Sequence, residues 1–217
     1  MTKSFFNKMM WTAIIAGLLA SIADIMILYS PNGGYHLMDY LYLKDVPYQR
    51  LLIGHYLGLV TIPRYLMGLW WVAKAMKPAG EHIPMRVFSF LSFLLIWGVL
   101  YHGLVAMIWM LVDSQENPQA IIDKGRVFFE PVSTIIIVMV IIACSVFSYW
   151  VLKGKSLFPK WIIWCTPVFS FIIFILLYIF IPIIGNYLIV SGFNLSVGIF
   201  LFAAWIALKD KYHLLIQ

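Results

Sequence analysis

Six long apolar segments run through this 217-residue chain, and they limit its possible folds more than any other feature. A helix needs about 20 apolar residues to cross about 30 Å of hydrocarbon, and a lipid-exposed backbone must satisfy its own hydrogen bonds. The segments therefore predict an all-α, polytopic six-helix bundle that forms one integral membrane domain over residues 1–217. The expected helices are residues 11–29, 51–76, 87–112, 131–152, 161–184 and 187–208.

Composition excludes the soluble classes of protein. The chain is 63% hydrophobic and 11% charged, whereas soluble domains have about 45–50% apolar and about 25% charged residues. The net charge of +6 does not indicate nucleic-acid binding, because Lys and Arg form no run and no basic helix face. Cys144 and Cys165 lie inside apolar segments and are interpreted as small core residues.

Lys and Arg are divided unevenly between the two sides of the predicted bundle. The ten on the side of the N-terminus are Lys3, Lys8, Lys74, Lys77, Arg86, Lys153, Lys155, Lys160, Lys209 and Lys211. The four on the other side are Lys44, Arg50, Lys124 and Arg126. By the positive-inside rule, this asymmetry predicts an inner-membrane protein with both termini in the cytoplasm.

The first segment also imitates a signal peptide. Lys3 and Lys8 precede an apolar run, and Ser21-Ile22-Ala23 has the small residues of a cleavage site. We favour an uncut first helix, because the apolar run continues over residues 25–28.

Polar side chains at bilayer depth are costly and indicate function by default. Four ionisable residues lie inside the predicted helices, and Glu130 lies at the edge of the fourth; the four are Asp24, His55, Arg64 and His102. At 1.5 Å rise per residue, Asp24 and His55 lie roughly 6–8 Å below the outer helix ends, His102 roughly 15 Å and Asn194 roughly 10 Å. Tyr178 lies at a similar depth. We therefore expect an outward-opening polar pocket among the first three helices and the sixth.

Helix faces refine this expectation. Asp24 shares a stripe of small residues with Ala13, Gly17 and Ala20, so it should point into the bundle. The second helix has a packing stripe with a GxxxG pattern, formed by Gly54, Gly58, Thr61, Tyr65 and Gly68. An ideal helix points His55 and Arg64 to opposite sides of that stripe. Because Pro63 interrupts the helix, the sequence leaves open whether Arg64 joins the polar cluster.

Several kinds of site fit these residues. Asp24, His55, His102 and Glu130 are suitable ligands for zinc or iron, although no HxxxH, HExxH or CxxC spacing is present. Haem between the two histidines, a metal-free acid–base pair and a structural hydrogen bond between helices are the alternatives. Arg64 either pairs with Asp24 or with carbonyls freed by Pro63, or it binds an anionic head group. Tyr65, Asn194 and Tyr178 complete the predicted substrate-binding set.

The first half of the chain resembles a family of bacterial six-span membrane proteins known only as a domain of unknown function. The matching residues are Ala23-Asp24, Tyr29-Ser30-Pro31, Arg50-Leu51-Leu52, the Gly54–Gly68 helix with Ile62-Pro63, and Tyr101-His102-Gly103. The resemblance implies a topology and a shared polar set, without an activity. Ceramidase-like membrane hydrolases use Ser, Asp and three His on seven helices, so they offer a chemical analogy alone.

Our leading hypothesis is an intramembrane enzyme that hydrolyses or isomerises a lipid or another apolar small molecule. Asp24 and His102 would act as acid and base or as metal ligands, His55 would assist, and Arg64 or Asn194 would orient a polar head. The long outer connections, residues 30–50 and 113–130, would cover the pocket. The alternatives are a small-ligand or proton-coupled carrier, although no inverted repeat is visible, and a structural membrane partner.

Overall fold

The computed structural model of this protein describes residues 2–30, 46–112 and 118–215, and within them it contains helices and no strand. The predicted all-α class is therefore confirmed. The α-helices are α1 (Lys3–Leu28), α2 (Tyr48–Thr61), α3 (Tyr65–Lys74), α4 (Ile83–Val112), α5 (Pro118–Leu152), α6 (Pro167–Phe180) and α7 (Pro182–Leu208). Short 3-10 helices are η2 (Ile62–Arg64), η3 (Lys77–Ala79), η4 (Lys160–Cys165) and η5 (Tyr212–Leu215).

Among the residues that the structure describes, four helices are long and apolar enough to cross a membrane. They correspond to α1, α4, α5 and α7, whereas α6 is a shorter apolar helix. The expected second span is divided into α2 and α3, which η2 joins at Pro63. The division follows from proline chemistry, because Pro63 has no N–H to donate to the preceding turn.

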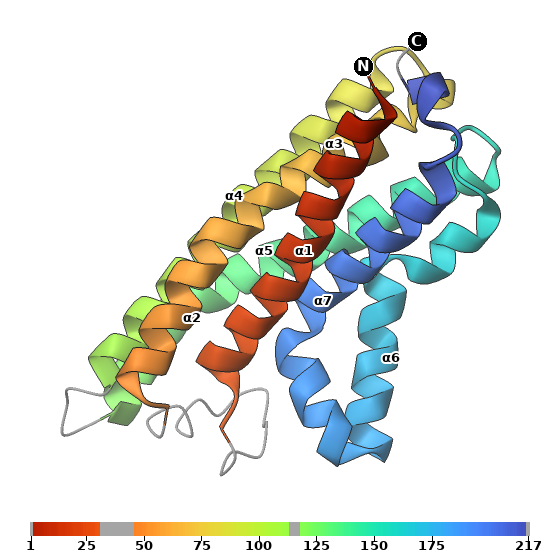
Figure 1. Ribbon diagram of the computed structural model, residues 1–217. Helices are drawn as coiled ribbons and strands as arrows, with labels where there is room; N and C mark the ends of the chain where they lie inside the picture. Colours follow the sequence, from red (N-terminus) through yellow and green to blue (C-terminus); the bar gives the residue numbers. More distant parts are fainter. Residues whose placement is uncertain (1, 31–45, 113–117, 216–217) are drawn as a thin grey trace.

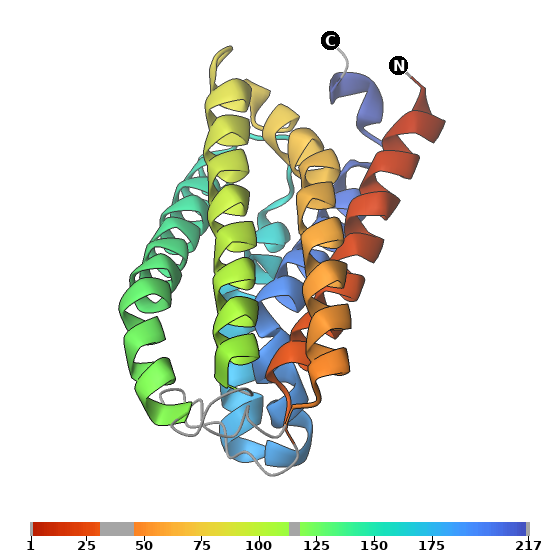
Figure 2. The same cartoon turned by 90° about the vertical axis from the view of Figure 1, so that its left-hand side faces the viewer.

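Helix α1 packs against α2 and α3 on one side and against α7 on the other (Figure 1). Helix α4 packs between α2–α3 and α5, and α6 pairs with α7 (Figure 2). Both chain termini lie at one end of the bundle, which we call the terminal end. The end of α1, the start of α2 and the junction of α6 with α7 lie at the opposite end, which we call the far end.

The core is built on close contacts between small residues. Ala13, Gly17, Ala20 and Asp24 are all buried, so the predicted inward face of the first helix is confirmed. A Cβ added to Gly17 would lie 2.7 Å from the Cα of Gly198 in α7. The absence of side chains at this crossing therefore allows α1 and α7 to meet backbone to backbone.

The expected starts of two helices, α5 and α1, were wrong, because hydropathy reveals only the apolar part of a helix. Helix α5 begins at Pro118 rather than at residue 131, and Pro131 lies inside it. Its polar first part is stabilised by pairs four residues apart, Gln119 with Asp123 and Arg126 with Glu130. Helix α1 begins at Lys3, where Thr2 caps it, rather than at residue 11.

The turn between the last two helices also differs from the prediction. It lies at Ile181–Pro182 instead of Gly185-Asn186. A proline is well suited to the first position of a helix. The backbone N–H at that position has no partner within the helix, so its absence in proline costs nothing. The expected covering loops contain residues 31–45 and 113–117, including His36 and Asp39, and these lie outside the described residues.

Candidate functional site

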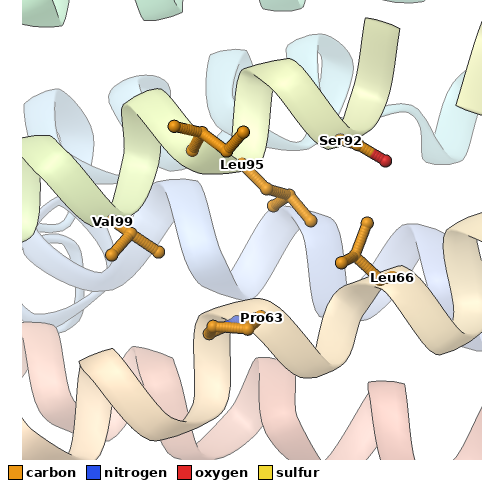
Figure 3. Close-up of a pocket in the computed structure, with 6 residues that line it drawn as sticks. Pro63, Leu66, Ser92, Leu95 and Val99 are labelled. Carbon is orange, nitrogen blue, oxygen red and sulfur yellow. The ribbon is translucent and has the colours of Figure 1, made fainter. Parts of the chain in front are cut away.

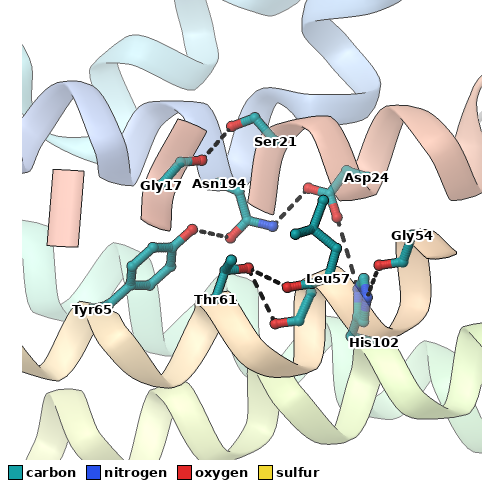
Figure 4. A network of polar contacts seen from close by, with 10 residues as sticks. Gly17, Ser21, Asp24, Gly54, Leu57, Thr61, Tyr65, His102 and Asn194 are labelled. Atoms are coloured by element: carbon teal, nitrogen blue, oxygen red, sulfur yellow. Dashed lines mark hydrogen bonds and ion pairs between the residues drawn. The ribbon is translucent and has the colours of Figure 1, made fainter. Parts of the chain in front are cut away.

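A line of polar contacts connects five helices in the interior of the bundle (Figure 4). The Tyr65 hydroxyl of α3 donates to Asn194 Oδ1 of α7 at 2.8 Å, and Asn194 Nδ2 donates to Asp24 Oδ2 of α1 at 2.7 Å. Asp24 Oδ1 lies 3.9 Å from His102 Nδ1 of α4. His102 Nε2 lies 3.4 Å from the carbonyl oxygen of Gly54 in α2. We call these five residues the Asp24 network.

The four residues that contribute side chains to the network are buried, since none of these residues is more than 8% exposed. Their hydrogen bonds also have fixed directions. The phenol of Tyr65 donates to the amide oxygen of Asn194, so the amide nitrogen faces Asp24. Asp24 Oδ2 is thereby an acceptor, and Oδ1 is the carboxylate oxygen that faces His102.

The two glycines of the GxxxG pattern in α2 admit two different neighbours. A Cβ on Gly54 would lie 2.9 Å from the carbonyl oxygen of Ala23, so Gly54 admits the backbone of α1. A Cβ on Gly58 would overlap the imidazole of His102, so Gly58 forms the slot that holds this ring. By contrast, no atom lies within 4 Å of a Cβ placed on Gly103, the residue after His102.

The hydroxyls beside the network are satisfied within their own helices. Ser21 donates to the carbonyl oxygen of Gly17 at 2.7 Å, and Thr61 donates to that of Leu57 at 2.7 Å. Back-bonding of this kind is usual for Ser and Thr in helices. These two hydroxyls therefore bond to their own helices and make no hydrogen bond to the Asp24 network in the described part of the chain.

His55 extends the network toward the surface of the bundle. Its ring lies face to face with that of His102, with centroids 5.8 Å apart and planes 9° from parallel. The residue is half-buried, and its Nδ1 atom is buried without a hydrogen-bond partner in the described part of the chain. The structure thus brings Asp24, His102 and His55 together in that order.

Three other predicted site residues lie outside this network. Arg64 is exposed on η2 and donates to the carbonyl oxygen of Val60, in the turn that Pro63 interrupts. Glu130 on α5 accepts from Arg126 Nε at 2.5 Å. Tyr178 lies on α6, which contributes no residue to the network. Its backbone packs closely on α7, since a Cβ added to Gly185 would overlap it.

The described residues contain no group of three or more His, Cys, Asp or Glu side chains placed to hold a metal ion. Asp24 and His102 come close enough for two ligands, and the ring stacking directs the face of His55, rather than a nitrogen lone pair, at His102. In this geometry the three side chains do not converge on one point, as the ligands of a metal ion do.

Arg50 has a structural role that the sequence analysis missed. Its Nε donates to the carbonyl oxygen of Met26 at 2.7 Å, and another guanidinium nitrogen donates to that of Tyr29. A cation at these unpaired carbonyls stabilises the C-terminal end of α1, four residues beyond Asp24. The signal in the sequence is a lone arginine opposite the end of the preceding helix.

A cavity of about 190 Å³ lies between the η2–α3 segment and α4 (Figure 3). It is lined by Pro63, Leu66, Ser92, Leu95, Ile96 and Val99. The hydroxyl oxygen of Ser92 is buried without a hydrogen-bond partner in the described part of the chain. Val99 precedes His102 by one helical turn, so this apolar space adjoins the polar network.

Comparison with known proteins identifies the family without adding an activity. The match to a family model covers residues 1–211, which is nearly the whole chain. No curated protein and no solved structure matches the chain. The expectation of a family without an assigned function is confirmed. The chain belongs to DUF6796, a family of unknown function.

Proposed function

We propose that this membrane protein takes up and releases one proton at Asp24 and His102 and couples that proton to the binding or carriage of a small ligand. The observation that carries the proposal is the contact of both His102 ring nitrogens with acceptor oxygens, 3.9 Å to Asp24 Oδ1 and 3.4 Å to Gly54 O. Ionisable residues buried among membrane helices commonly serve as proton relays.

Neither neutral form of His102 satisfies both ring nitrogens in this arrangement. With its proton on Nε2 the ring donates to Gly54 O, but the lone pair of Nδ1 then faces Asp24 Oδ1. With the proton on Nδ1, the lone pair of Nε2 faces the Gly54 carbonyl oxygen instead. One further proton, placed on the imidazole or on Asp24, gives every contact a donor and an acceptor.

Uptake of this proton changes the force between α1 and α4. The distance of 3.9 Å between Nδ1 and Oδ1 is longer than a hydrogen bond but within ion-pair range. The extra proton converts repulsion between lone pairs into attraction, so it draws the two helices together. Release of the proton lets them separate, and this is the movement that would couple the pair to a ligand.

His55 lies between His102 and the surface of the bundle, on the side where we expect the proton to enter. Its half-buried ring stacks on that of His102, and in the described part of the chain its Nδ1 is buried without a hydrogen-bond partner. Asp24 is locked on its other side by Asn194 and Tyr65. The proton therefore enters and leaves through the histidine side of the network.

The proposed topology has six spans in a bacterial inner membrane, with both termini in the cytoplasm. In it, α2–η2–α3 counts as one span and η4–α6 as another. The support is the positive charge of the terminal end, which has ten Lys and Arg residues and two acidic residues, Glu81 and Asp210. The Asp24 network then lies in the outer half of the membrane.

Histidine nitrogen NMR of the full chain in nanodiscs tests the proton site. We expect the ring-nitrogen signals of His102 in wild type to change between about pH 5 and 8, as the Asp24–His102 pair takes up its proton on either group. In Asp24→Asn this change is lost, because the amide can neither bind that proton nor balance a cationic ring. The exposed His82 and His213 are internal references. Ser21→Ala, one turn before Asp24, is the matched control and should leave His102 unchanged. A His102 signal that is the same in wild type and Asp24→Asn would refute the proposal.

The second candidate is the intramembrane enzyme acting on a lipid or apolar small molecule, and the cavity beside Val99 favours it. A hydrocarbon chain would occupy this apolar space, with its polar part near Ser92 and the reacting group toward His102. Asp24 and His102 would exchange protons with the substrate, His55 would assist, and Asn194 or Arg64 would orient its head. Lipid analysis of nanodiscs holding wild type or His102→Ala decides between the two: a product formed by wild type alone identifies the enzyme.

A further inference from the structure

Lysine side chains at the terminal end are held over aromatic rings. Each ammonium nitrogen lies 5.3–5.9 Å from a ring centroid. The pairs are Lys3 with Tyr212, Lys74 with Trp70, Lys153 with Tyr149, Lys155 with Trp150 and Lys209 with Trp205. We call these five lysines the lysine rim. Contact with the ring fixes the ammonium and leaves N–H donors for an anion.

Two of these lysines, Lys153 and Lys155, flank Gly154 just after α5 ends. Gly154 has a φ of +67°, and its N–H donates to Val151 O while that of Lys155 donates to Trp150 O. This is a Schellman motif, in which the left-handed glycine reverses the chain. Lys153 and Lys155 consequently fold back onto the consecutive rings Tyr149 and Trp150.

Neighbouring carboxylates do not neutralise the lysine rim. In the described part of the chain, the lysine rim forms one ion pair, in which Lys3 Nζ lies 3.6 Å from Asp210 Oδ1. Both side chains are exposed. Lys153 and Lys155 are exposed, and Leu157 of the same loop donates to Ala75 O beside Lys74. The loop after α5 therefore joins a cationic surface that includes the end of α3.

The positions of the aromatic rings along their helices indicate the level of the lysine rim relative to a membrane. Trp70, Tyr149, Trp150 and Trp205 lie near the ends of apolar helices, between the apolar helix bodies and the lysines. Trp70, Trp150 and Trp205 are partly buried against the core, whereas Tyr149 is exposed. Tryptophan, tyrosine and lysine at helix ends are the residues that sit at the level of lipid head groups. The exposed Trp161 and Trp164 extend the same belt along η4.

We propose that the lysine rim is a binding surface for the phosphates of anionic phospholipids, with Lys153 and Lys155 as its main clamp. The positive charge, its position at head-group depth and the prearranged ammonium groups all select an anionic lipid over a zwitterionic one. This inference is independent of the proton site, because it uses the opposite end of the bundle.

Native mass spectrometry of the detergent-purified full chain tests the surface, with phosphatidylglycerol and phosphatidylcholine offered at equal concentration. Wild type is expected to retain phosphatidylglycerol preferentially. Each lysine near an anionic surface contributes about 1 kcal/mol, so Lys155→Gln should weaken phosphatidylglycerol binding about fivefold and addition of Lys153→Gln should weaken it further. High salt should weaken wild-type binding in the same direction.

Three controls keep the outcome unambiguous. Lys124→Gln removes an exposed charge at the far end and should have no effect, whereas Lys153→Arg with Lys155→Arg should retain the preference. Thermal unfolding in phosphatidylcholine alone verifies that the variants are folded. Equal retention of the two lipids by wild type, or unchanged retention by the double glutamine variant, overturns the proposal. Displacement of the lipid by inorganic phosphate at comparable concentration would overturn it in favour of a soluble anion.

Discussion

The two faces of α4 contact their neighbours in opposite ways. Toward α2, the ring of His102 enters a slot at Gly58, and the contact is polar and tight. Toward α5, large apolar side chains such as Leu94, Trp97 and Leu104 pack on Val132, Ile136 and Val140. The first contact fixes one ring orientation, whereas the second tolerates small changes of shape. Buried polar chemistry in this bundle therefore depends on small residues at defined positions.

The largest effect is expected where two backbones touch. Gly17→Leu places a side chain against Gly198 of α7, and a backbone cannot move aside without separating α1 from α7. We expect a loss of about 3 kcal/mol in unfolding free energy, measured by denaturant unfolding in detergent. Gly98→Leu, on α4 where no atom lies within 4 Å of an added Cβ, is the control. Equal losses for the two variants would contradict a backbone contact at Gly17.

A smaller loss is expected when the slot for His102 is filled. Gly58→Ala forces the imidazole out of position at a cost of about 2 kcal/mol, because a side chain yields more easily than a backbone. The NMR signals of His102 should change with it. Gly103→Ala should instead be neutral or stabilise the helix by up to about 1 kcal/mol. Unchanged His102 signals in Gly58→Ala would disprove the slot.

Removal of the Tyr65 hydroxyl tests the buried end of the network. Tyr65→Phe leaves Asn194 Oδ1 without its donor, so we expect a loss of about 1 kcal/mol. Its coupling to Asn194→Leu in a double-mutant cycle should be positive and below about 2 kcal/mol. Tyr149→Phe, at an exposed ring, is the matched control. Additive effects of the two network variants would show that the hydrogen bond contributes nothing.

The smallest effect is expected on the apolar face of α4. Ile136→Val removes one methylene group from its contact with α5 and should cost about 0.5–1 kcal/mol. The His102 signals should stay as in wild type. A change in those signals would mean that the two faces of α4 are coupled, and the contrast between them would fail.

The apolar segments and the inward face of Asp24 could be predicted, because burial in a membrane leaves a direct mark on composition and helical spacing. Helix ends could not, since Pro118 begins a helix in a stretch that hydropathy assigns to a loop, and Pro182 begins a helix inside the stretch that hydropathy assigns to the preceding one. The sequence also placed Asp24, His55 and His102 in one region by depth. The pairing of Tyr65 with Asn194 required the three-dimensional approach of α3 and α7, which no spacing along one helix encodes.

Arg64 illustrates a different limit. The sequence left three partners open for it, which are Asp24, a carbonyl near Pro63 and an anionic head group, and in the structure it donates to the carbonyl oxygen of Val60 in the preceding turn. The rotation introduced by η2 decides this outcome, and it depends on how the chain adapts to Pro63. Arg50, in the first turn of α2, caps the end of α1, because its Nε donates to the carbonyl oxygen of Met26.

The bond between Asp24 and Asn194 joins residues 170 positions apart, and this separation has a consequence for biosynthesis. At about 5–20 residues per second, the ribosome delivers the amide partner on the order of 10 s after Asp24. During that interval Asp24 Oδ2 has no Asn194 amide from which to accept its native hydrogen bond. A chain that ends before α7 therefore leaves this carboxylate oxygen without its native donor.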